Sequence, residues 1–329
     1  MPSGPPPQLP RALTPRDLRR TIRSVCLVVA LFVASVTISA AVIVAFYAVI
    51  SMMMNNPSSL DLFMSGNTAE YEARVTEYMG QAVGLISCLS IIISASWFFL
   101  IRGKRFVTTD ITTKNARPSA LMLLQLVVLM FGVQFLMVLI NLALRPILQM
   151  IDVSATESMD DAMTSLFSTP WGILYVVIIG PIVEEMVFRG AVMRKLEPFG
   201  ANFAIITSSI LFGLYHIILF QAVFAFFVGM IFAYTAGRYS LKWAMALHIL
   251  NNLMACISTL TETVGVAITL IYLAGFIASI ALLVVRHGVL KIQNRAGAPL
   301  FPRVFKTAYS SPFFILFVVV FIFMGVWIL

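Results

Sequence analysis

Apolar residues occur along this chain in runs long enough to cross a lipid bilayer. A helix that spans the hydrocarbon core needs about 20 predominantly apolar residues. Runs near that length lie at residues 25–50, 79–101, 119–144, 170–194, 201–220, 221–236, 242–260, 264–285 and 313–329. The pattern predicts an all-α fold, a polytopic transmembrane helical bundle with eight or nine membrane helices.

The composition supports the same class. Of the 329 residues, 60% are hydrophobic and 11% are charged, which lies outside the range of soluble globular domains. The first apolar run is too long to be the core of a signal peptide, so we expect a retained anchor. Cys26, Cys88 and Cys256 are isolated inside apolar runs. Their isolation argues against a disulfide framework and against a cysteine metal site.

Charged residues sort by sign into the segments between the apolar runs. Most lysines and arginines fall in every second segment, so that they lie on one side of the membrane. They are Arg11, Arg16, Arg19, Arg20, Arg23, Arg102, Lys104, Arg105, Lys114, Arg117, Arg194, Lys195, Arg238, Lys242, Arg286, Lys291, Arg295, Arg303 and Lys306. The intervening segments hold Asp61, Glu70, Glu72, Glu77, Asp152, Glu157, Asp160, Asp161 and Glu262, with Arg74 and Arg145. By the positive-inside rule the N-terminus is cytoplasmic. This topology and the attraction of anionic headgroups account for the net charge of +8, so no nucleic-acid partner is expected.

Three charged residues interrupt the apolar run at 170–194, namely Glu184, Glu185 and Arg189. Each charged side chain at a helix centre costs about 2.5 to 3.5 kcal/mol on insertion scales, so their presence points to function. Glu185 precedes Arg189 by four residues, the favourable orientation for an ion pair. Adjacent helical residues point about 100° apart, so Glu184 has no partner on its own helix. It is free to face a water-filled cavity as a general base.

Two further apolar segments carry histidine. Phe212 and His216 lie on one, His248 and Asn252 on another. Glu184 and His216 lie at similar distances on either side of the predicted turn after residue 196, so the helical rise brings them to one depth. His248 and Asn252 share a helix face at an overlapping depth. We therefore expect the four polar side chains to meet, although each histidine or asparagine alone could be an ordinary contact between helices.

The small and polar neighbours of these motifs have plainer interpretations. Asn251 is off the face of His248 and is read as a polar contact. Gly229 and Ala233 have the small-xxx-small spacing of a helix contact. Phe212 in isolation would be an ordinary core residue.

The three motifs together resemble those of the CAAX protease and bacteriocin-processing family, also called the Abi family. Its EExxxR, FxxxH and HxxxN patterns correspond to Glu184, Glu185 and Arg189, then Phe212 and His216, then His248 and Asn252. The resemblance covers about residues 165–260. It implies an intramembrane endopeptidase, without a cofactor, in which Glu184 activates water and His216 orients or shares the proton. His248 and Asn252 would stabilise the oxyanion, supported by Glu185, Arg189 and Phe212.

This interpretation divides the chain into four segments. Residues 1–23 are expected to form a disordered basic cytoplasmic tail, and 24–165 the N-terminal transmembrane helices. Residues 166–262 would be the catalytic core, and 263–329 the C-terminal transmembrane helices with a basic cytoplasmic loop. The compact length and the arginine bias suggest a bacterial cell membrane. A peptide or protein substrate would reach the site from the bilayer or from the cytoplasmic side.

Other functions stay open at this point. Glu184, His216 and His248 are also a plausible zinc ligand set, although an HExxH motif is absent and the Asn252 amide is a poor zinc ligand. A proton or ion transporter would use Glu184 as a relay. A noncatalytic scaffold or immunity factor would keep only the helices. Neither the substrate nor a requirement for prenylation follows from these residues.

Overall fold

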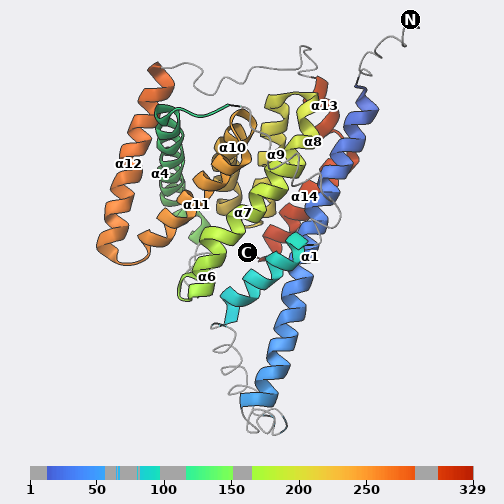
Figure 1. The fold of residues 1–329 in the computed structure, drawn as a ribbon, viewed down its shortest axis with the longest axis vertical. Coiled ribbons are helices and arrows are strands. Elements are labelled where there is room, and N and C mark those ends of the chain that lie inside the picture. Colours follow the sequence, from blue (N-terminus) through green and yellow to red (C-terminus); the bar gives the residue numbers. More distant parts are fainter. Residues whose placement is uncertain are drawn as a thin grey trace, which may run out of the picture.

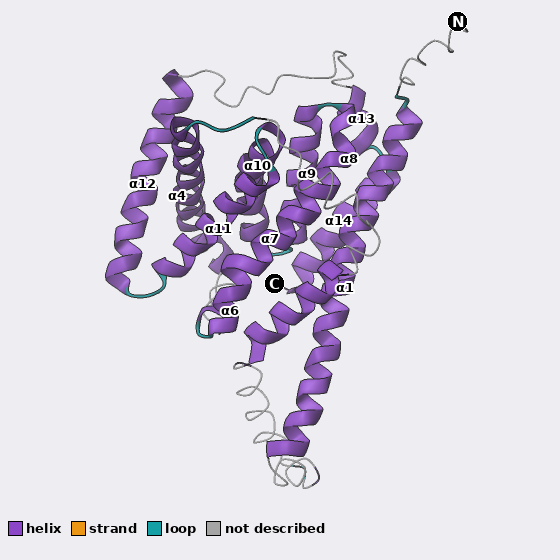
Figure 2. Cartoon of the chain, viewed as in Figure 1, coloured by secondary structure: helices purple, strands orange, loops and turns teal. Residues whose placement is uncertain are grey.

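The computed structural model describes residues 13–55, 64, 66, 80, 82–96, 116–150, 165–285 and 303–328. All regular secondary structure in these residues is helical (Figures 1 and 2). The α-helices are α1 (Pro15–Asn55), Ala82–Ser96, α4 (Ala120–Met150), α6 (Pro170–Leu174), α7 (Gly180–Glu185), α8 (Arg194–Leu196), α9 (Ala201–Tyr215), α10 (Leu219–Arg238), α11 (Leu241–Ser258), α12 (Glu262–Val285), α13 (Arg303–Tyr309) and α14 (Pro312–Ile328). The predicted all-α class is confirmed.

Five helical spans are long and apolar enough to cross a membrane. They are Pro15–Tyr47, Ala120–Leu144, Pro170–Phe199, Leu219–Arg238 and Glu262–Val285. A sixth results if α13 and α14, which bend by 60° at their junction, count as one span. The chain is therefore an integral membrane protein, and the predicted number of eight or nine spans is not confirmed. Helix α9 shows one reason, because its 15 residues reach only about 22 Å at 1.5 Å per residue.

The span Pro170–Phe199 forms the centre of the fold. It begins where Thr169 Oγ1 accepts the Gly172 N–H at 3.0 Å, with Pro170 in the first helical turn. Its α-helical pieces alternate with two π-helical segments, η2 (Tyr175–Ile179) and η3 (Met186–Met193), before the 3-10 turn η4 (Glu197–Phe199). Gly200, with φ 127°, separates this span from α9.

The remaining described helices surround this centre. Helices α4 and α12 lie side by side at one edge of the molecule, whereas α1, α13 and α14 lie at the other (Figure 1). Gly275 permits the contact of α4 with α12, because an added Cβ would come within 2.6 Å of Phe131 Cβ. Ser279 of α12 also donates a hydrogen bond to the Val128 carbonyl of α4 at 2.9 Å.

The N-terminal boundary differs from the prediction. Helix α1 begins at Pro15, so residues 15–23 are helical rather than a disordered tail. Thr14 and Asp17 cap this start reciprocally, since the Thr14 N–H donates to Asp17 and the Asp17 N–H donates to Thr14 Oγ1. Leu18 and Ile22 then bury one face of the basic segment. Residues 1–12 and most of the predicted basic loop, at 286–302, lie outside the described residues.

Candidate active site

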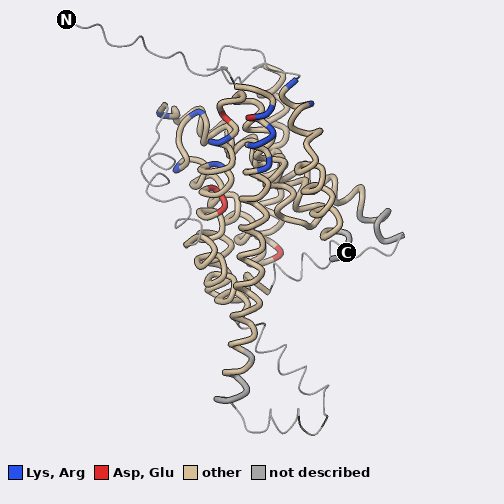
Figure 3. The backbone as a smooth tube through the Cα atoms, turned by 90° about the vertical axis from the view of Figure 1, so that its right-hand side faces the viewer, with Lys and Arg blue, Asp and Glu red and all other residues tan. Residues whose placement is uncertain are grey.

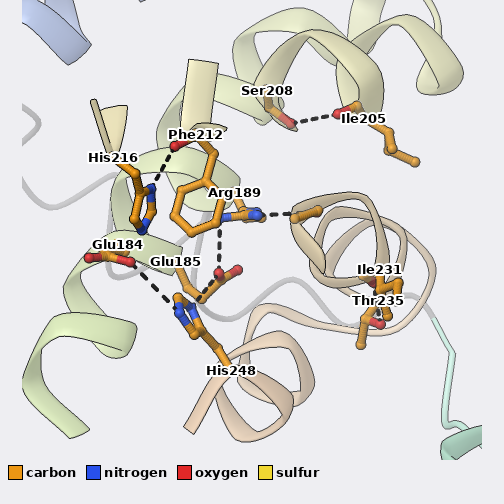
Figure 4. A network of polar contacts seen from close by, with 11 residues as sticks. Glu184, Glu185, Arg189, Ile205, Ser208, Phe212, His216, Ile231, Thr235 and His248 are labelled. Carbon is orange, nitrogen blue, oxygen red and sulfur yellow. Dashed lines mark hydrogen bonds and ion pairs between the residues drawn. The ribbon is translucent and has the colours of Figure 1, made fainter. Parts of the chain in front are cut away.

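Four helical elements bring the predicted polar residues together inside the bundle. Glu184 and Glu185 end α7, and Arg189 lies in the π-helical segment η3 that follows. His216 is the C-terminal cap of α9, and His248 lies in the middle of α11. Figure 4 shows the carboxylates, the guanidinium and both imidazoles in one cluster. The common depth expected from the helical rise is therefore found.

The ion pair expected from the spacing of Glu185 and Arg189 is present. Arg189 Nη1 lies 2.9 Å from Glu185 Oε1, and neither side chain is exposed. Arg189 Nη2 also donates to the Gly229 carbonyl of α10 at 3.1 Å. The guanidinium carbon lies 4.1 Å from the ring centroid of Phe212. The arginine therefore connects its own span to both α9 and α10.

Gly229 is required by this arrangement. A Cβ added at this position would lie 2.9 Å from Phe212 Cδ1 and 3.0 Å from Arg189 Nη2. The helix contact expected from the Gly229 and Ala233 spacing is therefore also the surface on which the arginine rests.

His248 lies between the two carboxylates. Its Nδ1 donates to Glu185 Oε1 at 3.0 Å, while its Nε2 lies 3.8 Å from Glu184 Oε2. Phe232 stacks on the imidazole at a centroid distance of 4.7 Å. The edge contact with Phe212 is longer, at 5.8 Å. The ring is held in a plane that directs Nε2 toward Glu184.

His216 approaches Glu184 from the other side. Its Nδ1 donates to the Phe212 carbonyl at 2.9 Å, which leaves Nε2 as the nitrogen available to the site. The ring stands over the Glu184 carboxylate in Figure 4, and the two groups interact electrostatically. A tight turn follows, in which Ile217 has φ 63° and the Ile218 N–H bonds the His216 carbonyl at 2.6 Å. This positive φ is a strained conformation for a β-branched residue.

Glu184 differs from Glu185 in its access to the site. Its side chain is 13% exposed, whereas that of Glu185 is fully buried. Two carboxylates against one guanidinium leave one uncompensated negative charge when both imidazoles are neutral. That excess charge lies on the side of the cluster where both histidines present Nε2. A water bound there would meet a proton acceptor and two imidazole nitrogens.

Asn252 makes two hydrogen bonds that its spacing did not predict. Its Nδ2 donates to the Val176 carbonyl of η2 at 2.8 Å, and its Oδ1 accepts from Asn251 at 3.1 Å. The structure therefore directs Asn252 toward the π-helical segment as well as toward the face it shares with His248. Asn251, expected to be a polar contact, also accepts a hydrogen bond from Gln134 of α4 at 2.9 Å. The predicted contact is confirmed.

Several residues around the cluster escaped the sequence analysis. Phe232 stacks on His248, and the backbone carbonyl of Gly229 accepts from Arg189. A search for polar sequence motifs finds neither contact. Gln134 lies outside the motifs altogether. Pro181 is a signal that a carbonyl one turn earlier lacks its backbone donor, but only the π-helical register of η2 identifies that carbonyl as the one of Val176.

The zinc set considered above is only partly consistent with this geometry. Within the described ranges, no group of three or more His, Cys, Asp and Glu side chains is arranged to hold a metal ion. Both site histidines nevertheless anchor Nδ1 on an acceptor and keep Nε2 for the site. Histidine ligands of metals are typically oriented in this way.

The polar cluster lies within a segment that matches a known family. Residues 166–254 match the family of type II CAAX prenyl endopeptidases described as Rce1-like. The resemblance inferred from the three motifs is thereby confirmed for this segment. The Rce1-like segment contains Glu184, Glu185, Arg189, Phe212, His216, His248 and Asn252. No curated protein and no solved structure matches the chain.

The buried ion pair predicts a large difference between two arginine substitutions. Arg189→Met leaves the Glu185 carboxylate buried without its cation, which typically destabilises by about 3 to 5 kcal/mol. Arg194→Met is the matched control, because Arg194 and Glu197 form a partly exposed pair at 2.8 Å worth about 0 to 1 kcal/mol. Thermal unfolding in detergent is expected to show a much lower Tm for Arg189→Met alone. Similar small shifts in both variants would contradict a stabilising role for the buried pair.

Proposed function

We propose that this protein is an intramembrane endopeptidase that hydrolyses peptide bonds with a water activated by Glu184. The observation that carries the proposal is the partly exposed Glu184 carboxylate between two imidazoles, with Glu185 neutralised beside it. The Rce1-like match of residues 166–254 supports a CAAX-type protease. A base, an orienting group and donors near one position are the minimum for general-base hydrolysis.

Glu184 would take a proton from the bound water, while Nε2 of His216 accepts the other water proton as a hydrogen bond and orients the oxygen. The oxygen then bonds to the peptide carbonyl carbon, and the carbonyl π electrons move onto its oxygen. When the tetrahedral intermediate collapses, the C–N bond breaks and Glu184 returns the proton to the leaving nitrogen. Each proton and electron pair is accounted for without a redox partner.

The developing oxyanion requires donors. His248 can donate to the oxyanion from Nε2 in its doubly protonated, cationic form, since Nδ1 already donates to Glu185. Asn252 uses one amide hydrogen on Val176 and keeps a second for the substrate. Removing one such donor typically lowers kcat by about a hundredfold or more. Glu185, Arg189 and Phe212 would hold these groups in place without contacting the reacting atoms.

The substrate would be a peptide or membrane protein, and no cofactor is required. A CAAX-type substrate is favoured by the Rce1-like match, and other peptide processing is the second possibility within the family. The bilayer itself is a partner of the protein, because many large apolar side chains on α1, α12 and α14 are exposed. We propose a bacterial cell membrane as the location.

Substitution of the base is the direct test of this function. Glu184→Gln retains the shape and part of the hydrogen bonding but cannot take a proton, so proteolysis is expected to fall at least about a hundredfold. Cleavage fragments of the membrane proteome, and of prenylated and unprenylated CAAX peptides, provide the measurement. Glu262→Gln, at an exposed position outside the cluster, is the matched control and keeps full activity.

The same comparison decides between enzyme and other functions. Full proteolysis by purified Glu184→Gln would overturn the mechanism. If wild type carries a proton or ion flux but yields no cleavage product, and Glu184→Gln loses that flux, the protein is a transporter instead. A cellular function that tolerates Glu184→Gln would establish the scaffold or immunity factor.

A zinc enzyme is the second candidate, favoured by the orientation of the two histidines. The water mechanism predicts an active, metal-poor protein after exhaustive chelation and metal analysis. It also predicts that His248→Ala and Asn252→Ala each lower kcat strongly with a modest change in KM, because oxyanion donors act in the transition state. A metalloenzyme would instead contain stoichiometric zinc and need it for activity. The zinc would then be lost in His248→Ala and retained in Asn252→Ala.

The orientation in the membrane is also a proposal. Among the described residues, most of the lysines and arginines gather toward one end of the bundle (Figure 3). The positive-inside rule assigns the basic end to the cytoplasm.

Cysteine labelling tests this assignment. The exposed positions 116 and 263 lie before α4 and at the start of α12. In intact cells, a membrane-impermeant maleimide is expected to label Thr263→Cys and to spare Ala116→Cys until the cells are opened. The native cysteines Cys26, Cys88 and Cys256 are buried, which keeps the background low. The reverse pattern would invert the proposed topology.

A further inference from the structure

A proline leaves one backbone carbonyl of the central span without a helical donor. Gly180 donates its N–H to the Tyr175 carbonyl, five residues earlier. In that π-helical register the next donor, for the Val176 carbonyl, would be residue 181. Residue 181 is proline and has no N–H. The carbonyl of Val176 instead accepts from Asn252 Nδ2 at 2.8 Å.

This contact is the end of a chain of three side-chain amides. Gln134 Nε2 of α4 donates to Asn251 Oδ1 at 2.9 Å. Asn251 Nδ2 donates to Asn252 Oδ1 at 3.1 Å, and Asn252 donates onward to Val176. Asn251 is almost fully buried, with 3% of its surface exposed. The chain thus joins α4, which lies outside the Rce1-like segment, to α11 and η2.

The Val176 carbonyl determines how all three side-chain amides are oriented. A carbonyl can only accept, so Asn252 must turn its amide nitrogen toward Val176 and its oxygen toward Asn251. Asn251 must then present nitrogen to that oxygen and its own oxygen to Gln134. If any one of these amides turned over, two acceptors would face each other inside the membrane, where unmet polar groups are costly.

We propose that Gln134 and Asn251 are positioning residues that hold the Asn252 amide with its nitrogen toward the substrate side of α11. The proposal rests on the proposed function, in which the second N–H of Asn252 stabilises the oxyanion. A turned amide would present oxygen there and would repel the developing negative charge. Pro181 is the cause of this arrangement, because it leaves the Val176 carbonyl without a backbone donor and so available to orient all three amides.

The kinetic test removes the first donor of the chain. Gln134→Leu is expected to lower kcat by about three- to tenfold, as the loss of one hydrogen bond implies, while KM changes by less than about twofold. Gln125→Leu, at a second glutamine of α4 that is itself buried, is the matched control and retains wild-type kcat. In the Asn252→Ala background, Gln134→Leu is expected to lower kcat no further, because it acts through that amide. An equal loss in both backgrounds would overturn the positioning role.

A thermal test examines the chain without any measurement of proteolysis. Asn252→Leu is expected to lower Tm by several degrees in the protein with Pro181, because the Val176 carbonyl then loses its donor. In the Pro181→Ala background the new N–H can bond Val176, so the same substitution is expected to lower Tm less. Equal Tm losses would overturn the role of Pro181. If no substrate is cleaved by wild type, the proposed function fails, yet this thermal cycle still decides whether Asn252 supplies the donor that Pro181 denies to the Val176 carbonyl.

Discussion

The buried ion pair of Glu185 and Arg189 is the interaction on which the site depends. Both side chains are fully shielded from solvent, 2.9 Å apart, in a span that is otherwise apolar. A charge at this depth is tolerated only when it is paired and further bonded. The pair meets that condition through the Gly229 carbonyl, the ring of Phe212 and the imidazole of His248. Three neighbouring helices are thereby tied to the span that carries Glu184.

That pairing separates the tasks of two adjacent carboxylates. Glu185 is committed to Arg189 and His248, so it stabilises the bundle and orients an imidazole. Glu184 keeps partial exposure and a contact of 3.8 Å to the same imidazole. A single turn of helix therefore supplies both a structural anion and a chemically available one. Glu184 stays available as the proposed base because Glu185, and not Glu184, pairs with Arg189.

Departures from regular helix geometry occur where the polar groups gather. The central span contains two π-helical segments, one before Glu184 and one that includes Arg189. Such segments are frequent at functional sites because they free backbone groups and rotate side chains relative to an α-helix. Here the freed Val176 carbonyl recruits Asn252, and the strained turn at Ile217 follows His216. Local irregularity supplies contacts that a uniform helix would satisfy internally.

The sequence by itself determined the class of fold and most of the cluster. Apolar runs of membrane length require helices, and charges within such a run require partners, so Glu184, Glu185, Arg189, His216 and His248 could be grouped by spacing and depth. The number of spans was less predictable, because apolarity alone does not tell a spanning helix from a short one such as α9. The start of α1 was misjudged, since its basic first turns are capped by Thr14 and Asp17 and bury Leu18 and Ile22.

Only the tertiary structure decided which atoms meet. Periodicity places Asn252 on a face of α11, but the Val176 carbonyl that binds it comes from a distant span. Gln134 and Phe232 carry no motif, and their contacts arise from how α4 and α10 pack against α11. Helical spacing describes neighbours along one helix, whereas contacts between helices depend on packing, such as the close approach that Gly229 allows. For that reason the chemistry could be predicted from the residues, and its geometry required the fold.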